Sequence, residues 1–208
     1  MKLKKFLAVT LAATIVMSSA MTVSASYYDS SSSSESESST DSEDVQAANA
    51  PIEIAGTTVK TSIAGAYAAK SVQGTAVITP LADVKANLGL KDGQVPAITI
   101  YDTDPVKSSK AMDSINAAID ALGEGAEMLT ALNVDLGAKE DGKWVALEDG
   151  SVAMAAGLPE GSDLTKTYSV ICVQPGGVIT ILEDQDTNPA TVTFAVQAGI
   201  GTYALVAQ

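Results

Sequence analysis

An acidic turn near the C-terminus has a spacing that suits a cation. Asp184, Asp186 and Asn188 stand at alternate positions, the order that opens oxygen-lined calcium loops. Pro189 stands where an EF-hand loop needs glycine, and Ala195 replaces its bidentate glutamate, so an EF-hand is excluded. Two interpretations stay open: a weaker calcium site of the extracellular type, and a solvated hairpin loop.

Two further acids, Asp102 and Asp104, follow an apolar run and precede a predicted helix. Functional groups of α/β proteins gather at such strand ends, where two carboxylates can bind a cation or act as acid and base. Asp104 directly before Pro105 also has the form of an ordinary N-cap. We expect the capping role for Asp104, which leaves Asp102 as the less explained acid.

Glycoside hydrolysis needs two carboxylates and no histidine, so composition alone does not exclude it. The chain has one tryptophan, two phenylalanines and six tyrosines, which offers few rings for stacking on sugars. We expect Trp144 to lie in the core of a strand-rich domain. An exposed Trp144 with Tyr168 or Tyr203 nearby would instead favour carbohydrate binding.

Several catalytic residue types are missing. The chain has no histidine, its 12 cationic residues are all lysine, and Cys172 is its only cysteine. Catalysis by Ser-His-Asp or Cys-His groups and an intrachain disulfide are therefore excluded. Without arginine, phosphorylated substrates rank low. We expect a protein that is not an enzyme and has no cofactor, unless the acidic turn binds calcium, with Cys172 as a buried hydrophobic residue.

The first 25 residues have the three-part pattern of a secretory signal. Lysines at the start precede an apolar run over 6–16 and a small-residue stretch that ends at Ala25, after which we expect cleavage. An uncleaved anchor is the alternative, because the apolar tract approaches the roughly 20 residues that span a bilayer. We expect a secreted or envelope-associated protein whose mature chain does not insert into the membrane.

The rest of the chain is strongly acidic and begins with a low-complexity segment. The formal net charge is −13, and it is near −16 without the three lysines of the signal. Such a charge repels nucleic acid and anionic membranes, so neither is expected as a partner. Within residues 26–51, the run 29–44 contains only Ser, Thr, Asp and Glu, which predicts a disordered linker. Its role as a stalk, a glycosylated tract or a solubilising leader stays open.

Residues 52–125 are expected to form a small mixed α/β unit with two amphipathic helices. Alternating or β-branched runs predict strands at 57–63, 66–72, 75–79 and 95–101, the last of them buried. Thr79 and Pro80 suit the cap and first position of one helix. The clearer helix is indicated by apolar residues at helical spacing: Met112, Ile115, Ile119 and Leu122.

Residues 126–208 are expected to form an antiparallel Ig-like β-sandwich, which makes the predicted fold class α+β. Seven apolar runs, separated by turns, lie at 132–136, 144–147, 152–154, 168–173, 178–182, 191–196 and 202–206. Short strands at this spacing favour a sandwich or barrel. The clearest alternation predicts that Val192, Phe194 and Val196 point inward.

The C-terminal part resembles a known class of module. The segments concerned are Leu158-Pro159-x-Gly161, Lys166-Thr167-Tyr168-Ser169-Val170, Gly176-Gly177-x-x-Thr180-x-Leu182, Thr191-Val192-Thr193-Phe194 and Gly201-Thr202-Tyr203-Ala204-Leu205-Val206. In this order they are similar to the β-sandwich modules that close exported Gram-positive surface proteins. The resemblance covers about residues 144–208 and implies a surface location and an Ig-like sandwich, but no activity.

These observations favour an exported, non-catalytic extracellular or cell-envelope protein. Its role would be adhesion, scaffolding or the binding of a protein or glycan ligand. The alternative is a histidine-free hydrolase that uses carboxylates, or a carbohydrate-binding protein. A hydrolase of this kind requires two acids about 5–10 Å apart in a cleft.

Overall fold

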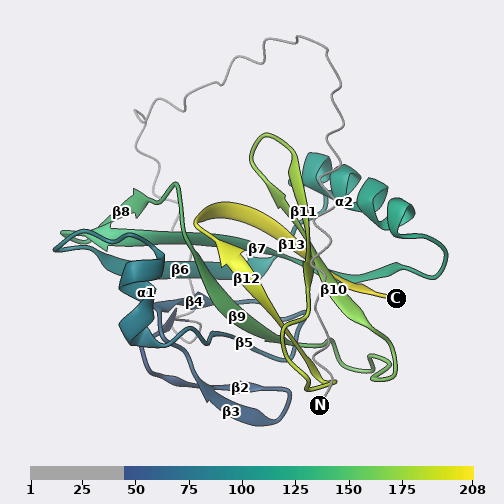
Figure 1. Ribbon diagram of the computed structural model, residues 1–208, viewed down its shortest axis with the longest axis horizontal. Helices are drawn as coiled ribbons and strands as arrows, with labels where there is room; N and C mark the ends of the chain where they lie inside the picture. The colour runs from purple at the N-terminus through teal and green to yellow at the C-terminus, as the bar shows by residue number, and fades with distance from the viewer. Residues whose placement is uncertain (1–44) are drawn as a thin grey trace, which may run out of the picture. The chain divides into compact units, whose positions relative to one another are not determined.

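A computed structural model describes residues 45–208, which form a mostly β structure with two short helices (Figure 1). The strands are β1 (Val45–Gln46), β2 (Pro51–Ile54), β3 (Thr57–Lys60), β4 (Ala64–Tyr67), β5 (Thr75–Val77), β6 (Val95–Asp102), β7 (Glu127–Glu140), β8 (Lys143–Ala146), β9 (Ser151–Gly157), β10 (Tyr168–Gln174), β11 (Val178–Glu183), β12 (Thr191–Gln197) and β13 (Gly199–Ala207). The helices are α1 (Leu81–Asn87) and α2 (Ser109–Leu122). The expected signal, 1–25, and the linker residues 26–44 lie outside the described residues.

The strands form one large sheet, one small sheet and a separate hairpin. The large sheet has the order β1-β4-β6-β7-β13-β10-β11, and β8 extends it beside β7. The small sheet has the order β12-β9-β5, and β2 pairs with β3. Every pair is antiparallel except β4 with β6. This sheet-rich architecture fits a β-sandwich.

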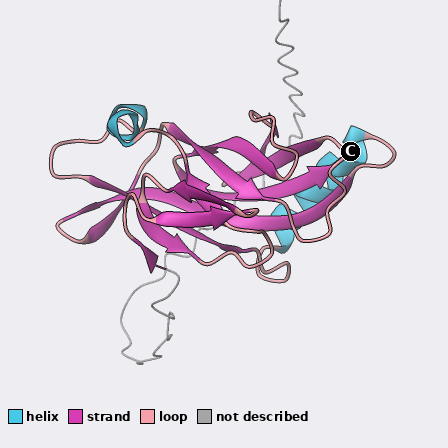
Figure 2. Cartoon of the chain, turned by 90° about the horizontal axis from the view of Figure 1, so that it is seen from below, coloured by secondary structure: helices cyan, strands magenta, loops and turns pink. Residues whose placement is uncertain are grey.

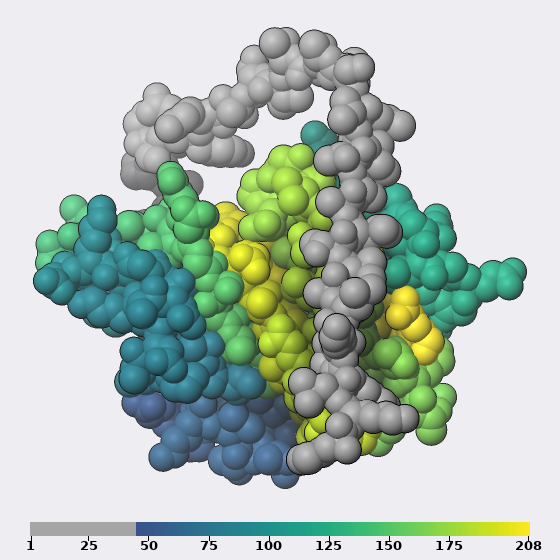
Figure 3. Space-filling model, in the orientation of Figure 1, coloured from purple at the N-terminus to yellow at the C-terminus, as the bar shows by residue number. Residues whose placement is uncertain are grey.

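The main core lies between the large and the small sheet. Alternate residues of β7, among them Leu132 and Leu136, are buried against Met154 of β9 and Phe194 of β12. Figure 3 shows the molecule from the side on which β9 and β12 lie next to each other. The expectation that Val192, Phe194 and Val196 point inward is confirmed, since all three are fully buried.

The opposite face of the large sheet, here called the outer face, is covered at one end by α2. Ile115 of α2 is fully buried there against Ile171 of β10 and Val206 of β13. The predicted apolar positions Met112, Ile119 and Leu122 are partly buried in the same cluster. Figure 2 shows α1 and α2 at opposite ends of the strands, so α2 leaves the rest of the outer face uncovered.

Strands from both expected units lie in the same sheets. β6, from residues 52–125, pairs with β7, from residues 126–208, and β5 pairs with β9 across the same division. The hydrophobic pattern of a strand reports how deeply it is buried but does not identify the strand beside it. The sequence therefore indicated the strands without indicating that the two halves share them.

Three local expectations are corrected by the structure. The linker ends earlier than residue 51, because Val45 opposes Ala66 in a short strand and Asn49 donates its backbone N–H to the carbonyl of Thr61 at 2.7 Å. Thr79 does not cap α1, since its Oγ1 accepts the N–H of Ala153 at 2.7 Å. The strand over 95–101 is not wholly buried: Val95 and Tyr101 are 60% and 45% exposed.

Candidate functional site

Asp102 holds a neighbouring loop. Its Oδ2 accepts the backbone N–H of Lys70 at 2.9 Å, and its Oδ1 accepts the N–H and the hydroxyl of Ser71 at 3.1 and 2.5 Å. Thr130 of β7 donates its hydroxyl to the Ser71 Oγ at 2.6 Å. Both oxygens of this carboxylate therefore fasten the loop to the sheet, a structural role that the sequence left unexplained.

Asp104 caps a turn, not the helix itself. Its Oδ1 accepts the backbone N–H groups of Val106 and Lys107 at 2.9 and 3.2 Å, and α2 begins only at Ser109. These hydrogen bonds lower the pKa of the Asp104 carboxyl. Asp102 and Asp104 bond to different segments, so the two acids do not form the acid and base pair that their spacing suggested.

The oxygens of the acidic turn are used mainly within the turn and by β12. Asp184 Oδ1 accepts the N–H of Asp186 and of Thr193, at 3.1 and 2.9 Å. Asp186 Oδ2 accepts hydrogen bonds from the hydroxyls of Thr191 and Thr193. Asn188 Oδ1 accepts the backbone N–H of Ala190. In residues 45–208, no three acidic or cysteine side chains gather as metal ligands would. Calcium binding at this turn stays a prediction.

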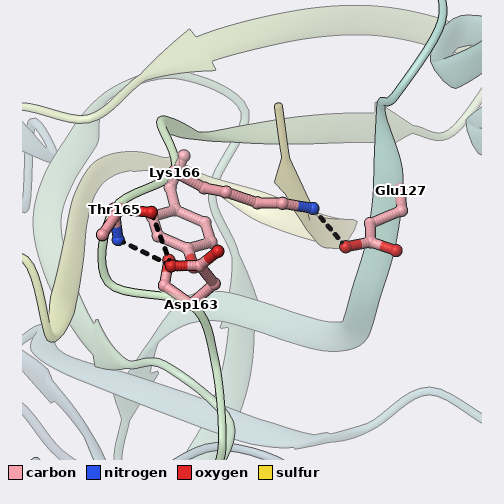
Figure 4. A network of polar contacts seen from close by, with 5 residues as sticks. Glu127, Asp163, Thr165 and Lys166 are labelled. Carbon is pink, nitrogen blue, oxygen red and sulfur yellow. Dashed lines mark hydrogen bonds and ion pairs between the residues drawn. The ribbon is translucent and has the colours of Figure 1, made fainter.

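A polar network closes the loop before β10 (Figure 4). Lys166 Nζ lies 2.6 Å from Glu127 Oε1, and this hydrogen bond raises the pKa of the Lys166 ammonium. Asp163 accepts the N–H and hydroxyl of Thr165, while the Tyr168 hydroxyl donates to the Asp163 carbonyl at 2.6 Å. Each group has a partner within the loop or on β7, so the network is structural.

The other candidate groups of the C-terminal half are buried. Cys172 is 1% exposed, and burial raises the pKa of its thiol, as expected for a buried hydrophobic residue. Tyr168 and Tyr203 are 6% and 1% exposed, so neither offers a ring to a ligand. The expected neighbours of an exposed Trp144 are therefore unsuitable.

Trp144 is not a core residue. It lies on β8 with 40% of its surface exposed, which corrects the expectation of burial. Its indole lies against Gly137 of β7: a Cβ added there would stand 2.5 Å from the indole Cζ2. Only glycine lets the ring lie so close to the neighbouring strand, and this contact fixes the indole on the outer face.

Four cross-strand rows make up the part of the outer face that α2 leaves uncovered, here called the open end. In order along β6, they are Val95, Lys139 and Trp144; then Ala64, Ala97, Gly137 and Ala146; then Ala66, Thr99, Asp135 and Ile200; then Tyr101, Asn133 and Thr202. Directly opposed residues share a face of an antiparallel pair, so these side chains lie on one side. The exposed rings of Trp144 and Tyr101 thus belong to the first and the last row, with the row of small residues and the row of Asp135 between them.

Asp135 lies near the middle of the open end. Partial burial raises the pKa of its carboxyl, and no described residue donates a hydrogen bond to it. Its neighbours across the strands are Thr99 and Ile200, neither of which brings a positive charge. A pocket of about 350 Å³ lies near the start of β6 and is lined by residues that include Val45, Val95 and Lys139.

A second pocket, of about 660 Å³, lies between the end of α1 and the segment after β8. It contains Asn87, Lys91, Glu148 and Asp149 but no aromatic side chain. The two acids are exposed and accept no hydrogen bond from a described residue. Two carboxylates without hydrogen-bond partners thus line this pocket.

Sequence reasoning missed Tyr101, Asp135 and Gly137. Strict alternation along β6 places Tyr101 on the face opposite to Ile98 and Ile100, but the apolar, β-branched composition of the run predicts burial of both faces. Asp135 stands inside an apolar strand, which is itself a signal of a special position. The closeness of Gly137 and Trp144 depends on strand register, which no single sequence reveals.

No described helix is both long and apolar enough to span a bilayer. Comparisons with protein-family models, with curated proteins and with solved structures gave no match to this chain.

Proposed function

We propose that this chain is an exported, non-catalytic binding protein of the extracellular space or the cell envelope, and that its open end binds a neutral glycan. The observation that carries the proposal is the pair of exposed rings, Trp144 and Tyr101, on one face of the large sheet with a row of small residues between them. α2 packs at the other end of the outer face and does not reach these two rings.

The chemistry of the open end supports a sugar ligand. Aromatic rings stack on the apolar C–H faces of sugar rings, and a ring fixed by packing loses little conformational entropy when it binds. Asp135 and Thr99 lie between the two rings and can exchange hydrogen bonds with hydroxyl groups. Charged residues of the four rows are limited to Asp135 and Lys139, which favours a neutral ligand over an ionic one.

The non-catalytic part of the proposal is supported by the partners of the acids. Asp102 and Asp104 are held by backbone N–H groups, and Asp184 and Asp186 by their own turn and β12. Carboxylates used in this way orient loops and are not free to transfer protons in a cleft.

One pocket supports a second candidate function, a carboxylate-dependent hydrolase. Glu148 and Asp149 are exposed in the pocket beside α1 and have no partner among the described residues. If this candidate is right, the purified chain hydrolyses glycans, and Glu148→Gln or Asp149→Asn abolishes the turnover while Glu160→Gln does not. If the chain hydrolyses no glycan, the hydrolase function is excluded and the binding proposal is unaffected.

We also propose that the C-terminal strands have an Ig-like arrangement suited to a surface protein. The antiparallel pairing of β7, β13, β10 and β11 in one sheet and of β9 and β12 in the other supports it. An experimental structure with a different strand order in this half would contradict the arrangement.

Export is a separate part of the proposal and rests on the pattern of residues 1–25. N-terminal sequencing of the protein recovered from the culture medium or cell wall should begin after Ala25. Recovery of the chain from the cell interior with Met1 intact would contradict export.

Affinity electrophoresis tests the binding proposal. The chain is run in native gels that contain a soluble neutral polysaccharide: a β-glucan, a mannan or a xylan. We expect at least one of them to retard the unaltered chain, and Trp144→Ala and Tyr101→Ala to remove the retardation. Leu164→Ala is the control, because Leu164 is 51% exposed on the loop before β10. Equal retardation of all four proteins, or of none, would overturn the proposal.

A further inference from the structure

β11 forms one edge of the large sheet. It pairs with β10 through six consecutive residue pairs without a register shift, and the sheet order ends at β11. In an antiparallel strand, alternate residues point their N–H and C=O groups away from the partner strand. The free edge of β11 therefore presents a row of backbone groups that only another strand can pair with throughout.

The side chains of β11 do not protect this edge. Val178, Ile179 and Ile181 are 56%, 42% and 49% exposed, and five of the six residues in the strand are uncharged. Edge strands that remain unpaired commonly carry lysine, proline, a bulge or an inward charge, and β11 has none of these. The hairpin of β10 and β11 stands out from its neighbours in Figure 3, in light green.

We propose that β11 pairs with β11 of a second copy of this chain, antiparallel, so that two large sheets join into one. Two-fold symmetry keeps the outer faces of both copies on the same side, and only registers that oppose residues of the same face satisfy it. Centred on Thr180, such a register places Ile179 opposite Ile181 twice and Val178 opposite Leu182 twice. Apolar residues thus meet apolar residues at every position of β11 except the central Thr180 and the terminal Glu183.

The charges along the hairpin favour a second copy as the occupant. Glu183 is the one charged residue of β11, and in this register it lies opposite Gly177 of the other copy. The turn before β11, Pro175-Gly176-Gly177, is neutral, so the acidic end of each strand meets an uncharged turn. Like charges are therefore kept apart in a chain whose net charge is −13.

The helices leave room for this pairing. α2 packs on the outer face over β10, and its buried Ile115 contacts that region. Two copies of α2 would be separated by three strand spacings, about 14 Å, whereas packed helices need only about 8–10 Å. The space between the helices is where Ile179 and Ile181 of both copies lie, so pairing removes these side chains from water.

The proposal predicts a weak dimer that salt strengthens. A contact of six residues buries less than the roughly 800 Å² per partner of a standard interface, so we expect a dissociation constant in the micromolar range or weaker. The net negative charge of each copy opposes association, and salt screens that repulsion. If the open end binds glycans as proposed above, the dimer also presents two open ends on one side, which favours polymeric ligands.

Sedimentation velocity of the full chain, from about 10 µM to about 1 mM and in low and high salt, tests the pairing. We expect a dimer whose dissociation constant falls as salt rises. Thr180→Lys places two lysines opposite each other at the two-fold axis and should raise the dissociation constant at least about tenfold. Val178→Lys should do the same and serves as a second variant if Thr180→Lys does not fold.

The control is Val106→Lys, the same change at a residue that is 82% exposed in the turn before α2. It should leave the dimer unaffected. A wild-type chain that stays monomeric throughout, or one that dimerises as tightly with Lys at 178 and 180, would overturn the proposal. Because no glycan is present in this measurement, its outcome does not depend on the proposed binding function.

Discussion

Both ends of the outer face have small residues on the sheet surface, but the side chains around these residues differ. At the covered end, Ala131 and Ala204 lie beneath α2 and contact aliphatic residues such as Ile115. At the open end, Ala97 and Gly137 are equally small, but exposed side chains such as Trp144, Val95 and Ile200 surround them. In both places the small residues allow another group to come close to the sheet. At the covered end the chain supplies its own occupant, whereas the open end has none among residues 45–208.

The largest effect that separates the two ends is expected for Ile115→Ala. This change leaves a cavity beneath α2 and should lower the free energy of unfolding by about 3 kcal/mol. The matched change at the open end, Ile200→Ala, should cost less than about 0.5 kcal/mol, because Ile200 is 57% exposed. Urea unfolding followed by circular dichroism measures both. Equal losses would mean that the two ends do not differ as described.

A smaller loss of stability is expected for Asp102→Ala, at the end of β6 next to the open end. The change leaves the N–H groups of Lys70 and Ser71 without their acceptor and should cost about 2 kcal/mol. Glycan retardation in native gels should be unchanged, and Asp104→Ala serves as the control with a smaller loss. If Asp102→Ala removed binding without loss of stability, the acid would belong to the site.

Gly137→Ala tests the position of the indole. The added methyl group would overlap the Trp144 ring, so the ring must move, at a cost of about 1 kcal/mol in stability and about tenfold in glycan affinity. In a Trp144→Ala background the same change should cost clearly less stability, because the overlapping ring is gone and only the close approach of the added Cβ to the Val145 carbonyl oxygen, at 2.9 Å, remains. A loss of equal size in both backgrounds would show that Gly137 does not act through Trp144.

The smallest expected effect is the pH dependence introduced by Asp135. Burial raises the pKa of the Asp135 carboxyl above that of an aspartate in the unfolded chain, so the ionised form is disfavoured in the folded state. Asp135→Asn should therefore unfold at a slightly higher temperature than the unaltered chain near pH 7. This difference should disappear as the pH falls through the raised pKa and past the pKa of the unfolded state, because the carboxyl is then protonated in both states. Asp120→Asn, on the exposed side of α2, is the control, and a difference that grows on acidification would contradict the account.

The elements of the fold were largely readable from local patterns. The spacing of Met112, Ile115, Ile119 and Leu122 predicted α2, and β-branched runs predicted most strands close to their observed positions. These patterns succeed because burial of one face is recorded in the residues of the element itself. The residues of one strand do not indicate which strand pairs with it, so the pairing of β6 with β7 could not be predicted from the sequence.

The open end was harder to predict for the same reason. Tyr101, Gly137 and Trp144 come from β6, β7 and β8, and only the register of these strands brings them to one face. The spacing of Asp102 and Asp184 relative to the next acid suggested cation sites, but in the structure both carboxylates accept hydrogen bonds from backbone N–H groups. A spacing that suits a cation also suits a turn, because both need oxygen acceptors at alternate positions.

Fluorescence of the single tryptophan tests the central claim most directly, since Trp144 is the only indole in the chain and lies in the proposed site. The full chain is titrated with the soluble glycans that retard it in gels, and its emission spectrum is recorded. We predict a saturable blue shift, because a sugar stacked on the ring replaces water, and we predict that Tyr101→Ala weakens it. Saturable retardation in gels with an unchanged emission spectrum would place the glycan elsewhere and contradict the account.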